Sequence, residues 1–194
     1  MTLRSLCVVI LMLVVAGSGN AWVQEKPTAA PARLLTELKS KDKGDRRDAA
    51  NQLGAMRARG ALRALVEALS DKEAKVREAA AFALGQIADP AATGLLIPLL
   101  ADPDTEVRAS AAFALGMIGD RKATQALSYA IGDREVEVRS SAIFALGLMQ
   151  DEQAVDEIVD ALDDPSFDVR YDAVWALGQI GACLCPGGGC QPTV

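Results

Sequence analysis

Five arginines recur along the chain at a constant interval of 31 residues. They are Arg46, Arg77, Arg108, Arg139 and Arg170. A row of guanidinium groups could bind anions or take part in catalysis, because each group carries a permanent charge and a fork of N–H donors. The constant interval suits a structural role equally well, repeated once in every unit of a repeating fold. Other features of the chain must decide between the two interpretations.

The chain contains no histidine. This absence excludes Ser-His-Asp catalysis, zinc held by histidines, and covalent haem attachment at a C-x-x-C-H motif. Asp and Glu residues remain, but they recur at equivalent positions of the repeat. Such recurrence indicates helix caps and solvated faces rather than one acid and base pair with divided roles. We therefore expect a non-enzymatic protein with no catalytic residue, no metal and no cofactor.

Three cysteines lie near the end of the chain, at Cys183, Cys185 and Cys190, and Cys7 lies near its start. The C-x-C-x4-C spacing stands in a Gly-rich stretch without a fourth ligand, which is a weak signal for a metal site. Three interpretations stay open: a tail with incidental oxidation, a disulfide-linked dimer, and a site for Cu(I) or Zn(II). We favour the first.

The elements that position these side chains repeat at the same interval. Glycines that each follow a leucine stand at Gly54, Gly85, Gly116, Gly147 and Gly178. Self-similarity with this period predicts a solenoid, in which each unit buries its apolar face only against its neighbours. We expect an all-α fold, an αα-superhelix of about five helix pairs in which the glycines let neighbouring helices approach closely.

Apolar columns four residues apart predict the first helix of each unit. One column is Leu34, Leu65, Leu96, Leu127 and Ile158, and the other is Leu38, Leu69, Leu100, Ile131 and Leu162. A turn carrying Asp71, Asp102, Asp133 or Asp164 follows. The dipeptides Asp102-Pro103 and Asp164-Pro165 are typical of a helix N-cap followed by proline at the first helical position.

The second helix has the strongest pattern, V-R-E-A-A-A-F-A-L-G-Q-I at Val76–Ile87 and V-R-Y-D-A-V-W-A-L-G-Q-I at Val169–Ile180. The underlying pattern D-x4-V-R-x-x-A-x-x-A-L-G-x-I covers roughly residues 30 to 181. It resembles the short HEAT-like repeats of phycobilin lyases and related bacterial proteins, whose functions are diverse. The resemblance implies that turn aspartates and helix arginines form a structural ladder between adjacent units. Its members here would be Asp71, Arg77, Asp102, Arg108, Asp133, Arg139, Asp164 and Arg170.

One aromatic residue per unit occupies the same position of the second helix, at Phe82, Phe113, Phe144 and Trp175. This position lies about 145° from the centre of the helix's packing arc, so we expect the rings to face a concave groove. Acidic residues run beside the rings, at Glu106, Glu137 and Asp168, and Tyr171 is assigned to the same surface. Such a groove suits a protein or peptide that presents apolar side chains near Lys or Arg. In the alternative interpretation, the rings lie flat between adjacent helices and only thicken the core.

The chain is divided by composition into four segments. Residues 1–21 are typical of a signal peptide, since Arg4 precedes an apolar run too short to span a bilayer. Residues 22–32 predict a Pro/Ala linker, residues 33–181 the HEAT-like repeat domain, and residues 182–194 a Cys/Gly-rich tail. We expect a periplasmic or secreted protein that meets the membrane only transiently, through its signal peptide.

The two ends of the repeat array differ. Asn51 and Gln52 stand in the first unit where later units place an aromatic residue and an alanine, so this polar copy predicts an N-terminal cap. No polar cap is evident at the other end. The uncapped C-terminal edge, or the tail cysteines, could therefore support self-association.

The net charge of −6 disfavours nucleic acid as a partner, because binding to phosphates relies on Lys and Arg. We expect an exported scaffold or adaptor that binds a protein or peptide on its concave face. The alternative is a protein that handles a chromophore in the manner of a phycobilin lyase, although an export signal conflicts with chromophore attachment in the cytoplasm.

Overall fold

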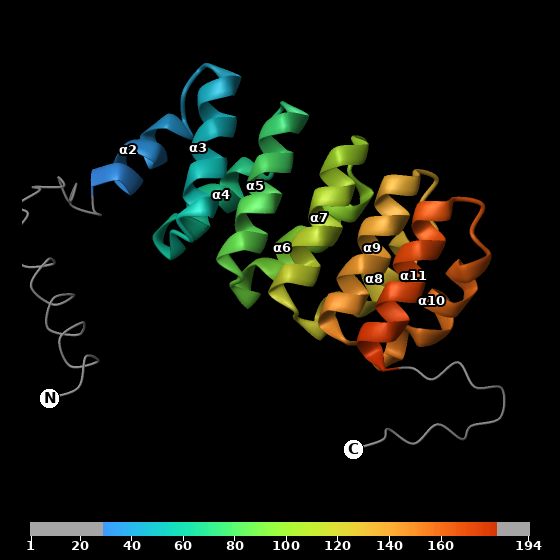
Figure 1. The fold of residues 1–194 in the computed structure, drawn as a ribbon. Coiled ribbons are helices and arrows are strands. Elements are labelled where there is room, and N and C mark those ends of the chain that lie inside the picture. Colours follow the sequence, from blue (N-terminus) through green and yellow to red (C-terminus); the bar gives the residue numbers. More distant parts are fainter. Residues whose placement is uncertain (1–28, 182–194) are drawn as a thin grey trace, which may run out of the picture. The chain divides into compact units, whose positions relative to one another are not determined.

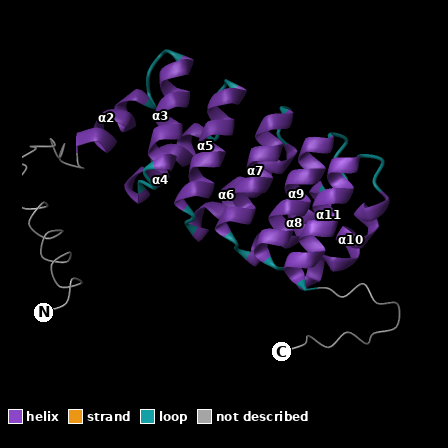
Figure 2. Ribbon diagram, in the orientation of Figure 1, coloured by secondary structure: helices purple, strands orange, loops and turns teal. Residues whose placement is uncertain are grey.

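A computed structural model describes residues 29–181, and this part of the chain is a row of paired helices (Figure 1). The first helices of the pairs are α2 (Ala29–Glu37), α4 (Leu62–Ala68), α6 (Thr93–Leu96), α8 (Thr124–Ala130) and α10 (Val155–Asp160). The second helices are α3 (Lys43–Ala55), α5 (Ala74–Ile87), α7 (Thr105–Ile118), α9 (Val136–Met149) and α11 (Phe167–Ile180). Residues 29–181 contain no strand, which confirms the all-α prediction (Figure 2).

From α4 onward, the first helices are short, and each has a 3₁₀ segment on at least one side. These are η1 (Arg59–Ala61), η2 (Pro90–Ala92), η3 (Ile97–Ala101), η4 (Arg121–Ala123), η5 (Glu152–Ala154) and η6 (Ala161–Asp163). Pro98 shows one cause, because it has no N–H to donate and α6 gives way to η3 at this point. The second helices run 13 or 14 residues without interruption, and they carry the regular rows of side chains.

The core lies between the two helices of each pair and continues from pair to pair. The predicted first column is fully buried, at Leu34, Leu65, Leu96, Leu127 and Ile158. The packing face of α5 is buried against it, at Val76, Ala80, Ala83, Leu84 and Ile87. Each buried leucine contributes roughly 1.5–3 kcal/mol relative to an exposed one, so the repeated column accounts for much of the stability.

Glycines bring neighbouring second helices into backbone contact. A Cβ atom added at Gly85 would lie 2.7 Å from the Cα atom of Ala114, and one at Gly116 would lie 2.6 Å from the Cα atom of Ala145. No side chain fits at these distances. The predicted close approach of the helices is confirmed, and it explains why a helix interior accepts glycine at a cost of about 1 kcal/mol.

The prediction that Asp102 and Asp164 are helix N-caps is wrong. The N-cap of α7 is Asp104, whose side chain accepts a hydrogen bond from the Val107 N–H, and the N-cap of α11 is Ser166. Asp102 lies two residues earlier and accepts the Asp104 N–H through Oδ1 at 2.9 Å. The aspartate therefore closes a local turn, and both of its carboxylate oxygens also accept hydrogen bonds from Arg77 of the preceding pair.

The predicted linker 22–32 extends too far, because α2 already begins at Ala29. Alanine favours helix, and Pro31 lies in the first turn, where an N–H has no intrahelical acceptor. The predicted signal peptide and the tail with its cysteines lie outside the described residues. Between residues 29 and 181, no helix is both long and apolar enough to cross a bilayer.

Candidate functional site

The aromatic column forms a continuous stack along the second helices. The ring centroids are 6.0 Å apart for Phe82 and Phe113, 5.8 Å for Phe113 and Phe144, and 4.6 Å for Phe144 and Trp175. The planes of successive rings differ by only 10–19°. All four side chains are half-buried. Each ring thus packs against its neighbours in the column and still keeps part of its surface in contact with water.

Three further rows of side chains accompany the stack, because residues at i, i+4, i+7 and i+11 share one face of a helix. The row nearest the helix starts is Lys75, Glu106, Glu137 and Asp168. The next row is Ala79, Ser110, Ser141 and Asp172, and the row beyond the rings is Gln86, Met117, Leu148 and Gln179. We call these three rows and the aromatic stack the second-helix face.

The second-helix face is acidic over its last three helices. Glu106, Glu137 and Asp168 are exposed, and Asp172 is half-buried and accepts a hydrogen bond from the Ser140 hydroxyl. The four rows carry no Lys or Arg on α7, α9 or α11. This part of the face therefore attracts cations and repels anions.

The face changes character at its first helices. Lys75 replaces an acid, and its Nζ atom lies 2.9 Å from Oε2 of Glu78, a hydrogen bond that raises the pKa of Lys75. Asn51 stands where the next helices place a ring. A hollow of about 390 Å³ beside Phe82 is lined by Arg47, Asn51, Lys75, Glu78, Ala79 and Ser110. The stack begins at this hollow, in mixed rather than acidic surroundings.

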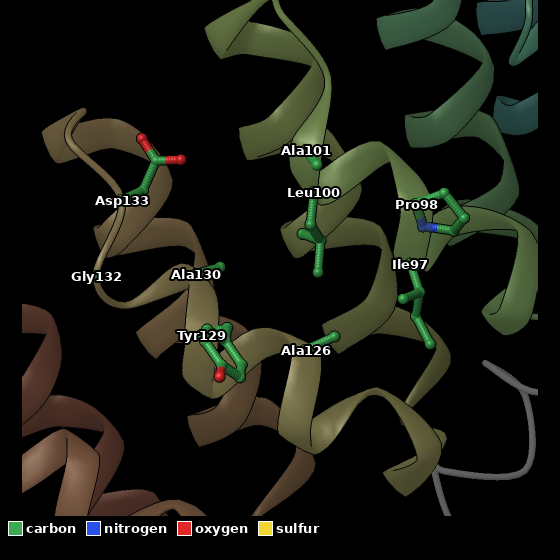
Figure 3. A pocket seen from close by; sticks show the side chains of 9 residues that line it. All are labelled: Ile97, Pro98, Leu100, Ala101, Ala126, Tyr129, Ala130, Gly132 and Asp133. Atoms are coloured by element: carbon green, nitrogen blue, oxygen red, sulfur yellow. The ribbon is translucent and has the colours of Figure 1, made fainter.

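A different hollow, of about 370 Å³, lies between successive first helices on another side of the molecule (Figure 3). Leu100 and Tyr129 border it from the two sides, and Tyr129 is 81% exposed. Its one ionisable group besides Tyr129 is Asp133, which already binds an arginine. This hollow can take an apolar group but offers little chemistry to orient it.

Arginines of one pair bind aspartates of the next pair in a bidentate manner. Arg77 donates from Nε to Asp102 Oδ2 at 2.8 Å and from Nη2 to Asp102 Oδ1 at 2.7 Å. Its Nη1 atom donates to the Asp71 carbonyl at 2.9 Å. The same three contacts recur for Arg46 with Asp71, Arg108 with Asp133 and Arg139 with Asp164. These four arginines are committed to protein acceptors, which argues against a row that binds anions.

The arginines lower the pKa of every aspartate in this ladder. For Asp71 and Asp164 the largest cause is the hydrogen bond from the arginine, and burial opposes it. For Asp102 and Asp133 burial is the largest single influence and raises the pKa. Hydrogen bonds from Arg77 or Arg108 and from a backbone N–H, together with positive charge nearby, outweigh it. All four carboxylates are therefore ionised at neutral pH.

The ladder differs from the expected set at both ends. Arg46 belongs to it, although the set implied by the resemblance began at Asp71. Arg170 belongs to that set but binds only the carbonyls of Asp164 and Pro165 within the described residues. The reason is geometric: each arginine reaches forward to the next turn, and residues 29–181 contain no turn after α11.

Tyr171 lies apart from the aromatic stack. It is 63% exposed, and its ring packs on Phe167 with 6.4 Å between centroids. Phe167 and Val174 are not among the predicted site residues, yet they are 68% and 61% exposed on the same helix. The 31-residue interval could have identified Val174, because the equivalent positions of the earlier helices are Ile143, Ala112 and Ala81, which are all buried. An apolar residue at this position of the last helix is therefore one that lacks its usual neighbour.

Over the range 29–181, no group of three or more Cys, Asp or Glu side chains could hold a metal ion. The three tail cysteines lie outside this range. Within residues 29–181, the second-helix face therefore presents partly buried rings beside exposed carboxylates, without a metal centre.

Comparisons with known proteins agree with this geometry. The family model of HEAT repeats matches residues 31–115, 62–135 and 124–184. A solved structure of the complex of CpcE and CpcF of phycocyanin lyase from Nostoc sp. PCC7120 is similar, with a TM-score of 0.71 and 29% identity, over 81% of this chain and 67% of that one. A designed armadillo repeat protein in complex with the peptide (KR)4 has a TM-score of 0.61 at 23% identity, over 78% and 81% of the two chains. None of the curated proteins matches the chain. The repeat array that the family model covers makes up most of the sequence, and the chain belongs to the HEAT repeat family.

Proposed function

We propose that this protein is a non-enzymatic adaptor that binds an extended protein segment or peptide along the second-helix face. The observation that carries the proposal is the stack of four partly exposed rings, continuous over four helix pairs and bordered by carboxylates. Aromatic side chains supply much of the binding energy in protein interfaces. A strip of this length suits an extended chain better than a compact small molecule.

The ligand should combine apolar side chains with Lys or Arg. Ring faces inside the stack are covered by neighbouring rings, so the exposed parts of the rings offer apolar contact rather than a cation–π site. Cationic groups instead meet Glu106, Glu137 and Asp168, while the methylene stems of lysine or arginine pack on the rings. Both ligand groups therefore find a partner at each step from α7 to α11.

We further propose that the adaptor works outside the cytoplasm. The support is the segment 1–21, with Arg4 followed by an apolar run and small residues. The natural place to look for the partner is then the cell envelope or the medium.

A binding titration tests the adaptor function. The probe is a synthetic peptide of alternating leucine and lysine, and the variant is Phe113→Ala/Phe144→Ala. We expect its Kd to rise about tenfold or more, because each anchor contributes at least about 1 kcal/mol. The matched control is Tyr129→Ala, which removes an exposed ring from another side of the molecule and should leave the Kd unchanged. Equal binding by all three proteins would contradict the proposal.

A second candidate is chromophore handling. The specific observation is the 29% identity to the phycocyanin lyase complex over 81% of this chain. Incubation with free bilin followed by an absorbance spectrum tests it. A shifted spectrum or a covalent adduct would favour this candidate over a protein-binding adaptor, and an unchanged spectrum would set it aside.

A further inference from the structure

The last helix exposes a surface that every earlier second helix buries. Val174 is 61% exposed, whereas Ile143 and Ala112 at the equivalent positions are fully buried by the following pair. A Cβ atom added at Gly178 would meet no other atom within 4 Å, whereas one at Gly147 would lie 2.8 Å from Ala176. The outer side of α11 is therefore a junction surface whose partner is missing from residues 29–181.

Arg170 indicates which chemical group the missing partner must supply. Its Nη1 atom donates to the Asp164 and Pro165 carbonyls at 2.8 and 3.0 Å, as the other arginines do to their own turns. In the four other pairs, Nε and Nη2 bind the carboxylate of the next turn. For Arg170, no acceptor for these two atoms occurs in the described part of the chain, so its fork is oriented for a carboxylate that another element must supply.

We propose that the α11 end surface, formed by Phe167, Arg170, Tyr171, Val174 and Gly178, receives a helical hairpin of a different protein. This hairpin carries an aspartate in its turn and small side chains on its second helix. The aspartate binds Arg170, and a small residue seats over Gly178, so the row of helix pairs continues across a chain boundary.

The side chains at the end surface agree with an interface to a partner. Phe167 and Tyr171 stack on each other, and the Arg170 guanidinium lies 5.8 Å from the Phe167 ring centre. Tyrosine and arginine are enriched among the residues that dominate interface energies. At the equivalent positions of the preceding junction the chain has the smaller Val136 and Ser140. The partner hairpin must therefore present small residues opposite the two rings.

A second copy of this chain does not supply the required hairpin. At the position of the turn aspartate, its first pair has Ser40, whose hydroxyl donates to Asp45 at 2.8 Å. Asp45 takes the place of the buried Val76, and Gln52 takes the place of Ala83, which seats over Gly54 in the first junction. Charge and size both favour a different protein.

The test builds the missing hairpin into a second version of the chain. The acceptor chain carries Ser40→Asp, Asp45→Val and Gln52→Ala, each copied from the second pair, and Arg170→Gln to prevent it from binding itself. It is mixed with the wild-type chain, and the mass of the mixture is measured by analytical ultracentrifugation. We expect a one-to-one complex, with wild type alone remaining a monomer. Circular dichroism and thermal unfolding of each variant establish that it is folded.

The Arg170→Gln variant of the wild-type chain is the matched control, and its Kd for the acceptor should rise about tenfold or more. Failure of the folded acceptor to bind wild type would overturn the proposal. Self-association of wild type alone would identify a second copy as the occupant and overturn it as well. Binding that appears only after residues 182–194 are removed would also overturn the proposal, because the chain's own tail would then be the occupant of the α11 end surface. None of these outcomes depends on peptide binding to the second-helix face.

Discussion

The junctions between pairs and the second-helix face use the same helices but follow different rules. At each inner junction the same residues return: an arginine fork on an aspartate, and a glycine under an alanine. On the face, Lys75 gives way to Glu106, and Ala79 to Ser110 and then Asp172. Junction residues contact a neighbouring pair, so a substitution there would disturb the packing between the two pairs. The acidic residues of the face, Glu106, Glu137 and Asp168, are exposed to water, which leaves them free to contact a ligand.

The largest effect on stability should come from breaking the ladder inside the array. Arg108→Gln leaves the Asp133 carboxylate without its bidentate partner at a site where both side chains are largely buried. We expect a loss of about 3 kcal/mol, near the lower end for buried pairs because Asp133 keeps some exposure. Urea unfolding measures this loss. Arg170→Gln, the same change at the open end, should cost less than 1 kcal/mol, and equal losses would contradict the comparison.

A smaller loss should follow from filling a junction glycine. In Gly116→Ala the new methyl group would lie 2.6 Å from the Cα atom of Ala145, so the two helices must separate. Thermal unfolding should show a loss of about 2 kcal/mol. Gly178→Ala places the same group in open space and should gain up to about 1 kcal/mol from helix propensity. The account fails if both substitutions change stability in the same direction.

Acid should weaken the junctions but not the face. The pKa values of Asp71, Asp102, Asp133 and Asp164 lie below the ordinary value of 3.8. Groups with a depressed folded pKa contribute their stability above the unfolded pKa, and this contribution is lost as the pH falls through the folded pKa. The free energy of unfolding should therefore fall with pH below about 4. Asp133→Asn removes one such group and should make this decline shallower, whereas an unchanged slope would contradict the assignment.

Substitutions on the face should change stability least. Glu106→Gln/Glu137→Gln removes two exposed charges and should alter the free energy of unfolding by no more than about 0.5 kcal/mol. The same variant should bind the leucine-lysine peptide more weakly and with less dependence on salt. Titrations at two salt concentrations measure both effects. A large loss of stability with unchanged binding would mean that the face is structural.

Much of the fold could be predicted because the same helix pair is repeated five times at an interval of 31 residues. The leucine columns and glycines have a single physical explanation, and the structure follows it. Local capping was harder, because Asp102 and Asp104 are both plausible caps in sequence and only the arginine contact separates them. Asp151 was missed entirely: it is fully buried and accepts a hydrogen bond from the Thr124 hydroxyl of the preceding pair. Such pairing across 27 residues depends on tertiary packing that the pattern of a single unit does not contain.

The exposure of the rings was also beyond sequence analysis. A helical wheel shows which side of α7 or α9 a ring occupies, but not how far it leans toward the ring of the next pair. The structure places Phe113 and Phe144 between the two expected alternatives, since they stack on each other and remain partly exposed.

The most direct test of the adaptor account is a map of the peptide contact by NMR, in which the leucine-lysine peptide is titrated into the isotope-labelled protein. We predict that amide shifts change along the second helices around Phe113, Glu137 and Phe144, together with the indole N–H of Trp175. Residues around Tyr129 on another side of the molecule should stay unchanged. Shifts confined to the Tyr129 hollow, or no shifts at saturating peptide, would contradict the account.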